Sequence, residues 1–235
     1  YKLRDKCLKD NEPERFEAFE DVVHSYLGET SFTPHGFKDV RLEHADKDAL
    51  FEGVGQIMEI LRGLGHKSFV NAGTLLGLIR DGKPIDHDDD VDLAVVLKNR
   101  RDELAAREWH VLHQKLNDAG IECDPAPGSW AVLKVPPVAG IQIDLFPAYG
   151  CKKHFSVYPY GRKKFAHSDI FPLKTCELSG LPVPAKPQRL LEGNYGSGWT
   201  VPDPGYVLQW KRYKKDFKRF LRNVEQGPNM SARPV

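Results

Sequence analysis

The sequence predicts an α/β (α+β) domain with a loop-rich C-terminal half. Two observations lead to this fold class. Segments with helical and strand periodicity alternate through residues 46–146, which is the pattern of a layered domain. From residue 147 onward the chain is rich in Pro, Gly and aromatic residues, so long ordered loops are expected there. At 235 residues the chain is long enough to bury one sizeable core.

Each regular element is indicated by the spacing of its apolar residues. Residues 46–65 place apolar side chains at helical intervals after an Asp-rich start, and glycines stand near the end of the segment. Residues 130–135 and 140–146 have the apolar runs of two strands, separated by the turn residues Pro136-Pro137 and Ala139-Gly140. The other expected elements are helices over 16–27, 74–80, 101–119 and 210–224 and strands over 68–73 and 91–97.

Charge and cysteine content exclude several classes of protein. Lys plus Arg (34) balances Asp plus Glu (33), so we expect no nucleic-acid partner. Four scattered cysteines are too few for a disulfide scaffold and favour a reducing compartment. Without an apolar run of membrane-spanning length we expect a cytoplasmic protein, with membrane association or, in a eukaryote, the Golgi lumen as alternatives. Because the chain starts at Tyr1 rather than Met, the question whether it belongs to a longer chain with other domains stays open.

The stretch PIDHDDDVDLAVVL (84–97) places five carboxylates in seven positions directly before an apolar run. Two carboxylates about 4 Å apart repel by ~1 kcal/mol in water and by ~4 kcal/mol at an effective dielectric near 20. Crowding them in a partly buried place therefore requires a cation. On an extended chain Asp88, Asp90 and Asp92 project to one side while the alternate apolar residues enter the core. Such hard oxygen ligands suit Mg²⁺ or Mn²⁺ together with a substrate phosphate.

A solvated acidic turn and a calcium loop are the alternatives to a catalytic metal at this acidic stretch. A solvated turn is the usual origin of such a run, but the abrupt join to a buried strand argues against it. A calcium loop of the EF-hand type is excluded, because Val91 and Leu97 stand where that loop needs Gly and Glu.

Asp144 supplies a further carboxylate, flanked by Ile143 and Leu145 in an apolar strand. An unpaired ionised side chain would be costly there. If this strand neighbours the strand over 91–97, Asp144 faces the same site and either ligates the ion or accepts a proton from an attacking hydroxyl. A carboxylate satisfied by a backbone turn before Pro147 is the alternative.

Gly73-Thr74 opens a helix upstream of the aspartates. The free N–H groups and dipole of a helix start favour an anion, and glycine allows a phosphate to approach the backbone closely. Arg80 and Lys83 stand between this helix start and the acidic stretch, where cations could neutralise phosphate oxygens. Solvated loop charges are the alternative for both.

At these residues the sequence resembles the nucleotidyltransferase fold superfamily. More narrowly, GTLLGLIRDGKPIDHDDDVDLAVVL with IDLFPAY resembles the LicD and fukutin family, as does DIFPLKTCELSGLPVPAKPQRLLEGNYGSGWTVPDP further on. The resemblance implies a nucleotidyltransferase-like mixed sheet flanked by helices. It also implies Mg²⁺-dependent transfer of a phosphate-linked small group, such as phosphocholine, glycerol phosphate or ribitol phosphate. The donor would be CDP-linked, the acceptor a glycan or polysaccharide hydroxyl, and CMP would leave.

The resemblance further implies roles for single residues. Asp90 and Asp92 match the residues that hold the metal, and Asp144 matches the base and is the third expected ligand. His87 stands where the family often has Trp, so the packing or donor contact that this Trp would make is not carried over to this chain. Asp88 matches the first acid of the family's Asp-rich run. Gly73, Thr74 and Arg80 match the phosphate-facing segment, and Tyr195-Gly196 matches the C-terminal Tyr-Gly pair.

The domain boundaries follow from these motifs. We expect a polar, helical N-terminal extension over 1–45, a nucleotidyltransferase-like catalytic domain over 46–205, and a basic helix and tail over 206–235. The tail could touch an anionic membrane surface, although a solvated helix face explains the same charges. Its cations are Lys211, Arg212, Lys214, Lys215, Lys218, Arg219 and Arg222.

Two weaker signals accompany the main one. Cys151, His154, His167 and Cys176 could make a structural zinc site, as in some fukutin-related proteins, but their irregular spacing favours scattered thiols and surface histidines. Sugar rings or a cytosine could stack on the C-terminal aromatics, which core packing explains equally well. These aromatics are Tyr195, Trp199, Tyr206 and Trp210.

Three other functions stay open on the sequence alone. A nucleotidyltransferase that moves a nucleoside monophosphate onto a small molecule, as aminoglycoside adenylyltransferases do, has a similar metal strand. A metal-dependent glycosyltransferase would need neither Gly73-Thr74 upstream nor Asp144 on a later strand. A non-catalytic metal- or glycan-binding module would show no turnover with any CDP-linked donor.

Overall fold

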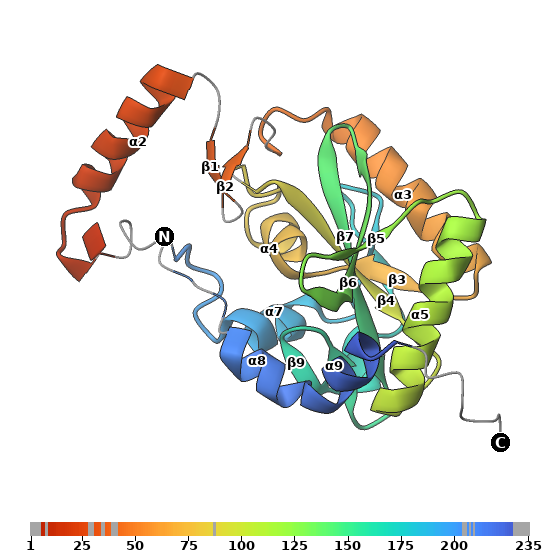
Figure 1. Cartoon of the computed structure of the whole chain (residues 1–235). Helices are drawn as coiled ribbons and strands as arrows, with labels where there is room; N and C mark the ends of the chain where they lie inside the picture. Colours follow the sequence, from red (N-terminus) through yellow and green to blue (C-terminus); the bar gives the residue numbers. More distant parts are fainter. Residues whose placement is uncertain are drawn as a thin grey trace.

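The structure of this protein is a computed structural model (Figure 1). It describes residues 6–227 except residues 8, 28–30, 34–35, 39–41, 87, 204–205, 207 and 209.

A seven-stranded mixed sheet forms the centre of the molecule (Figure 1). Its main path has the order β3-β4-β7-β6-β5, and β8 pairs with β7 while β9 pairs with β8. β4 and β7 run parallel, whereas the other neighbouring strands are antiparallel. The strands are β3 (Ser68–Val70), β4 (Asp90–Val96), β5 (Asp124–Ala126), β6 (Ser129–Val138), β7 (Ile141–Gly150), β8 (Phe155–Val157) and β9 (Gly161–Phe165).

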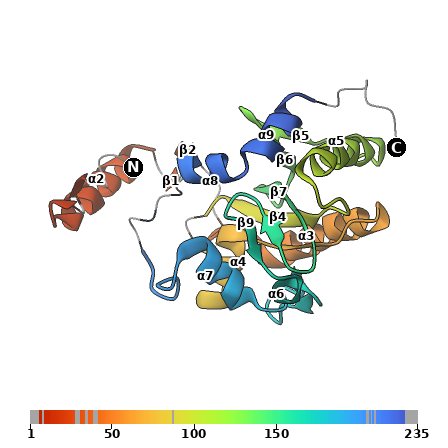
Figure 2. The same ribbon diagram turned by 90° about the horizontal axis from the view of Figure 1, so that it is seen from below.

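Helices cover both faces of this sheet. Figure 2 shows α5 (Asp102–Asp118) and α9 (Lys218–Glu225) on one face, with α3 (Lys47–Gly63), α4 (Ala72–Arg80) and α7 (Pro187–Tyr195) on the other. The predicted mixed sheet flanked by helices is therefore confirmed. Among the described helices, none combines the length and the apolar character that crossing a bilayer requires.

Smaller elements complete the described chain. Near the N-terminus, α2 (Pro13–Leu27) stands away from the sheet in Figure 1 and is followed by a hairpin of β1 (Ser31–Thr33) and β2 (Gly36–Lys38). The C-terminal half adds α6 (His167–Ile170), the pair β10 (Lys174–Thr175) and β11 (Pro182–Val183), and α8 (Trp210–Asp216).

The long helices form for the reasons that the sequence indicates. The Asp46 side chain caps α3 by accepting a hydrogen bond from the Ala49 N–H at 3.1 Å. The apolar stripe of α3 is buried in the core. Opposite it, α5 buries Trp109, whose indole N–H donates to the Trp130 carbonyl at 2.9 Å.

The turn between β6 and β7 differs in part from the prediction. Ala139 and Gly140 make the turn, with φ values of 49° and 81°. Pro136 and Pro137 instead lie inside β6, where the register against β7 shifts between Val135 and Val138. A proline has no N–H to donate to the ladder, so the two prolines fall where regular pairing is interrupted.

The C-terminal half is more regular than predicted, because β8, β9 and α7 replace part of the expected loops. The single helix expected over 210–224 is divided at Phe217 into α8 and α9. Phe217, Phe220 and Val224 are fully buried. The His110 ring nitrogen Nε2 also lies 2.8 Å from the Val224 carbonyl, which ties α9 to α5.

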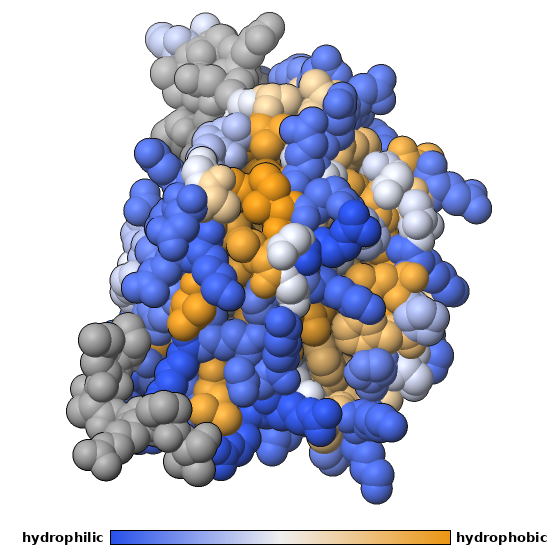
Figure 3. Space-filling model, turned by 90° about the vertical axis from the view of Figure 1, so that its right-hand side faces the viewer, coloured by the Kyte–Doolittle hydropathy of each residue, from blue (hydrophilic) through white to orange (hydrophobic). Residues whose placement is uncertain are grey.

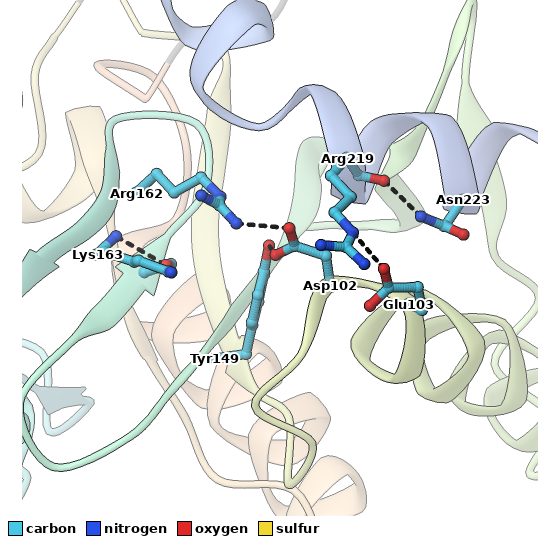
Figure 4. Close-up of polar contacts among 8 residues, drawn as sticks. Asp102, Glu103, Tyr149, Arg162, Lys163, Arg219 and Asn223 are labelled. Carbon is cyan, nitrogen blue, oxygen red and sulfur yellow. Dashed lines mark hydrogen bonds and ion pairs between the residues drawn. The ribbon is translucent and has the colours of Figure 1, made fainter.

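A buried polar cluster joins this C-terminal region to the sheet (Figure 4). Asp102, at the start of α5, accepts one hydrogen bond from the Tyr149 hydroxyl at 3.0 Å and one from the Arg162 guanidinium at 2.5 Å. Only 6% of the Asp102 side chain is exposed. Beside it on the surface, Arg219 of α9 pairs with Glu103.

Candidate active site

β4 and β7 lie side by side and bring two of the predicted aspartates together. The parallel register places Asp92 directly opposite Asp144. Paired residues of parallel strands project to the same face, so the two carboxylates share one side of the sheet. Both residues are buried, with 9% and 6% of their surface exposed.

The charges around Asp92 come from all of the predicted aspartates. The pKa of Asp92 is well above its ordinary value, first because the carboxyl is buried and then because Asp90, Asp88 and Asp144 repel its charge. The Gly73 N–H opposes this shift by donating to Asp92 Oδ2 at 3.3 Å. An ionised Asp92 is therefore costly unless a cation is added.

A second grouping of carboxylates includes a residue that was not predicted to take part. Oxygens of Asp88, Asp89 and Asp90 lie within 4.8 Å of one another. Within the described part of the chain, this is the one set of three or more His, Cys, Asp or Glu side chains that meets so closely. The expected metal ligands Asp90, Asp92 and Asp144 do not meet at that spacing. Neither do the residues considered for a zinc site, which are Cys151, His154, His167 and Cys176.

Backbone contacts hold the acidic segment in place. The N–H groups of Leu42 and Glu43 donate to the carbonyls of Asp88 and Asp86 at 2.9 and 3.1 Å. On the other side, a Cβ at Gly77 of α4 would lie 2.7 Å from the Lys83 carbonyl oxygen, so only glycine permits this close approach. His87 lies outside the described residues.

The start of α4 binds Asp92 itself. Thr74 Oγ1 accepts a hydrogen bond from the Asp92 N–H at 2.9 Å, and the Asn71 N–H donates to the Asp92 carbonyl at the same distance. The backbone at Ala72 is left-handed, with φ at 43°, a conformation that costs a residue other than glycine about 1 kcal/mol. Gly73 and Thr74 thus position the acidic strand, in addition to any phosphate contact.

The two cations predicted to face a phosphate are paired with carboxylates. Arg80 donates to both oxygens of Asp81 at 2.7 Å, and this pairing raises the pKa of Arg80. Lys83 pairs with Asp86 at 2.5 Å on an exposed loop. Arg80 is the more buried of the two, with 13% of its side chain exposed against 54% for Lys83.

Lys134 is a site residue that the motifs of the sequence did not identify. Its ammonium donates to both oxygens of Asp144 at 2.8 and 2.9 Å, across the antiparallel pairing of β6 with β7. The signal was present, since Lys134 is the one charge in the apolar strand WAVLKV. Lys134 therefore supplies a fixed positive charge beside the aspartates.

Tyrosines form the neighbouring wall, and Tyr160 among them was not predicted either. The hydroxyls of Tyr160 and Tyr195 lie 3.4 Å apart. Burial raises the pKa of both well above the ordinary value, and the charge of Asp92 adds to the shift. Their hydroxyls therefore stay protonated at neutral pH, as hydrogen-bond donors close to Asp92. The Tyr195 and Tyr206 rings, 5.1 Å apart, extend the wall.

Replacing Gly73 by Ala is expected to lower activity between about tenfold and a hundredfold without unfolding the protein, because an added Cβ would lie 2.7 Å from Asp88 Oδ2 and displace that carboxylate. Steady-state rates and thermal melting would measure the two effects. Gly55→Ala is the matched control, since a Cβ there makes only an ordinary contact of 3.8 Å with Leu181 in the middle of α3. Equal activity of the two variants would contradict this role of Gly73.

Comparison with known proteins links the site to one family. The family model described as "LicD/FKTN/FKRP, nucleotidyltransferase domain" matches residues 65–187, just over half of the chain, and this span includes every predicted aspartate. No curated protein sequence matches the chain.

Solved structures give more distant likenesses. The crystal structure of ANT(2")-Ia in complex with adenylyl-2"-tobramycin has a TM-score of 0.40 and 9% identity over 74% of this chain and 88% of that one. The lincomycin-bound lincosamide antibiotic adenylyltransferase LnuA has a TM-score of 0.38 and 14% identity over 74% of this chain and 96% of that one.

Proposed function

The chain belongs to the LicD/FKTN/FKRP nucleotidyltransferase-domain family, and we propose that it transfers a phosphate-linked small group from a CDP-activated donor to a glycan hydroxyl, releasing CMP. Membership makes the protein a transferase of phosphate-linked groups or of nucleotides. The proposed donors carry phosphocholine, glycerol phosphate, ribitol phosphate or a similar group.

One observation carries the proposal: Asp92 and Asp144 stand opposite each other on adjacent parallel strands, and the charges of Asp90 and Asp88 help to raise the pKa of Asp92. The Lys134 ammonium offsets the charge of Asp144, but an ionised Asp92 that is buried among these carboxylates still has a cost. A bound divalent cation together with donor phosphates would remove the cost.

The available ligands fit Mg²⁺ or Mn²⁺. All of them are carboxylate oxygens, which these ions prefer. One of them, Asp90, also lies within 4.8 Å of Asp88 and Asp89 at the start of β4. We propose that Asp90 and Asp92 hold the ion, with Asp144 as a third ligand and Asp88 beside them. When bound, the ion would neutralise the phosphate oxygens of the donor.

The protein's own residues would then position the reactants. Phosphoryl transfer depends mainly on alignment and on neutralising charge around phosphorus. A carboxylate has four acceptor positions, so Asp144 can hold the Lys134 ammonium and still accept a proton from the attacking hydroxyl. The protonated hydroxyls of Tyr160 and Tyr195 are suited to donate hydrogen bonds to phosphate oxygens of the CDP-linked substrate or to oxygens of the glycan.

A test of the proposal is to incubate the protein with Mg²⁺ and a panel of CDP-choline, CDP-glycerol and CDP-ribitol, with and without glycan acceptors. We expect one donor to give CMP in an amount equal to the phosphodiester product, and EDTA to abolish the reaction.

Two results would contradict the proposal. Release of pyrophosphate from a nucleoside triphosphate, with a nucleotide left on a small acceptor, would assign nucleotidyl transfer instead. Transfer of a sugar from a nucleotide sugar would assign glycosyl transfer.

A further inference from the structure

A cavity of about 920 Å³ lies at the end of β4 and β7 opposite to the aspartates. Val96 at the end of β4 and Gly150 at the end of β7 line it, together with the C-terminal half of α3. Asp90 and Val96 are six residues apart along β4, which corresponds to roughly 20 Å of strand. The cavity is therefore separate from the candidate active site.

The lining of this cavity is strongly basic, although the whole chain has a formal charge of only +1. Glu59 is the one carboxylate of the lining, and it pairs with Arg62. Within the described part of the chain, no carboxylate forms an ion pair with any of the other five cations, which face the cavity from four different segments. These five are Lys67, Lys98, Arg100, Lys152 and Lys174.

Apolar and aromatic side chains make most of the remaining lining. Phe155 and Phe171 pack edge to face with ring centroids 6.0 Å apart, and the Lys67 ammonium lies 5.7 Å from the centre of the Phe171 ring. Figure 3 shows the side of the molecule on which α3 and α5 lie, where apolar surface is exposed between hydrophilic side chains. A cavity of this size is in the range of small-molecule sites.

We propose that this cavity is a second binding site, for a small ligand that carries phosphate groups next to a planar or apolar part. The uncompensated cations would hold the phosphates through charge-assisted hydrogen bonds, and the phenylalanine rings would contact the planar part. The aspartates repel such a ligand when no metal is present, whereas this cavity attracts it. The proposal does not depend on the reaction assigned to the active site.

The experiment measures the binding of CDP to the whole protein in EDTA by calorimetry, with uncharged cytidine as the comparison. We expect CDP to bind more tightly than cytidine, and we expect its affinity to fall as salt is added. The double variant Arg100→Met/Lys152→Met should bind CDP about tenfold more weakly or worse. Lys214→Met/Lys215→Met, which removes the same charge from α8, should bind CDP as the unmodified protein does.

Alkylation of Cys151 gives a second measurement that does not depend on activity. This half-buried thiol lines the cavity, and its pKa is lowered by the backbone N–H groups of Lys153 and His154 and by Arg100. CDP should slow its reaction with iodoacetamide, followed by mass spectrometry. Equal binding of CDP and cytidine, unchanged binding by Arg100→Met/Lys152→Met, or unprotected Cys151 at saturating CDP would each overturn the proposal.

Discussion

Replacing Asp92 by Asn is expected to lower the rate of group transfer by about a thousandfold or more while leaving the protein folded. The substitution keeps the size of the side chain but removes the charge that we propose holds the metal. Because that charge is buried among other carboxylates, the free energy of unfolding without metal should stay unchanged or rise. The rate would be measured as CMP release and the stability by denaturant unfolding.

Asp86→Asn is the matched control for this experiment. Asp86 belongs to the same acidic run, but it is partly exposed and paired with Lys83 on the surface, so activity should change little. Mg²⁺ should raise the melting temperature of the unmodified protein and of Asp86→Asn, but not that of Asp92→Asn. Full activity of Asp92→Asn, or an equal response of all three proteins to Mg²⁺, would rule out the proposed metal site.

Replacing Asp102 by Ala is expected to have the largest effect on stability, lowering the free energy of unfolding by about 3 kcal/mol. The change leaves the Arg162 guanidinium without its carboxylate and the buried Tyr149 hydroxyl without its acceptor (Figure 4). Within the described residues Arg162 Nε already lacks a partner, so the guanidinium has little other compensation. Urea unfolding would measure the loss.

Glu103→Ala provides the comparison at the neighbouring position. Its partner Arg219 has 66% of its side chain exposed, so this ion pair should contribute less than about 1 kcal/mol. If the two variants lost the same stability, the Asp102 cluster would not be the connection between α5 and the sheet that we describe.

The fold and the aspartates could be predicted because each depends on a local pattern. Helical spacing identified α3 and α5, and the alternation of Asp with apolar residues identified the face of β4 that carries Asp90 and Asp92. A charge in an apolar strand identified Asp144 as a residue that needs a partner. The family assignment, which depended on these residues, is confirmed by the match over residues 65–187.

Contacts between distant segments could not be predicted in the same way. Lys134 and Tyr160 reach the site through strand pairing and through the packing of tyrosines, which no local spacing reveals. The break at Phe217 has a similar origin, because burial of Phe217 against the body overrides the helical pattern of the tail. The roles of the site residues, the metal and the domain boundaries stay predictions until they are measured.

The two hydrogen bonds from Leu42 and Glu43 to the acidic segment affect how the protein can be shortened. A recombinant version that began at α3, as the expected boundary at residue 46 would suggest, would keep every proposed metal ligand. It would nevertheless lose the backbone that fixes the carbonyls of Asp86 and Asp88. Any truncation meant to preserve catalysis should therefore start upstream of Leu42.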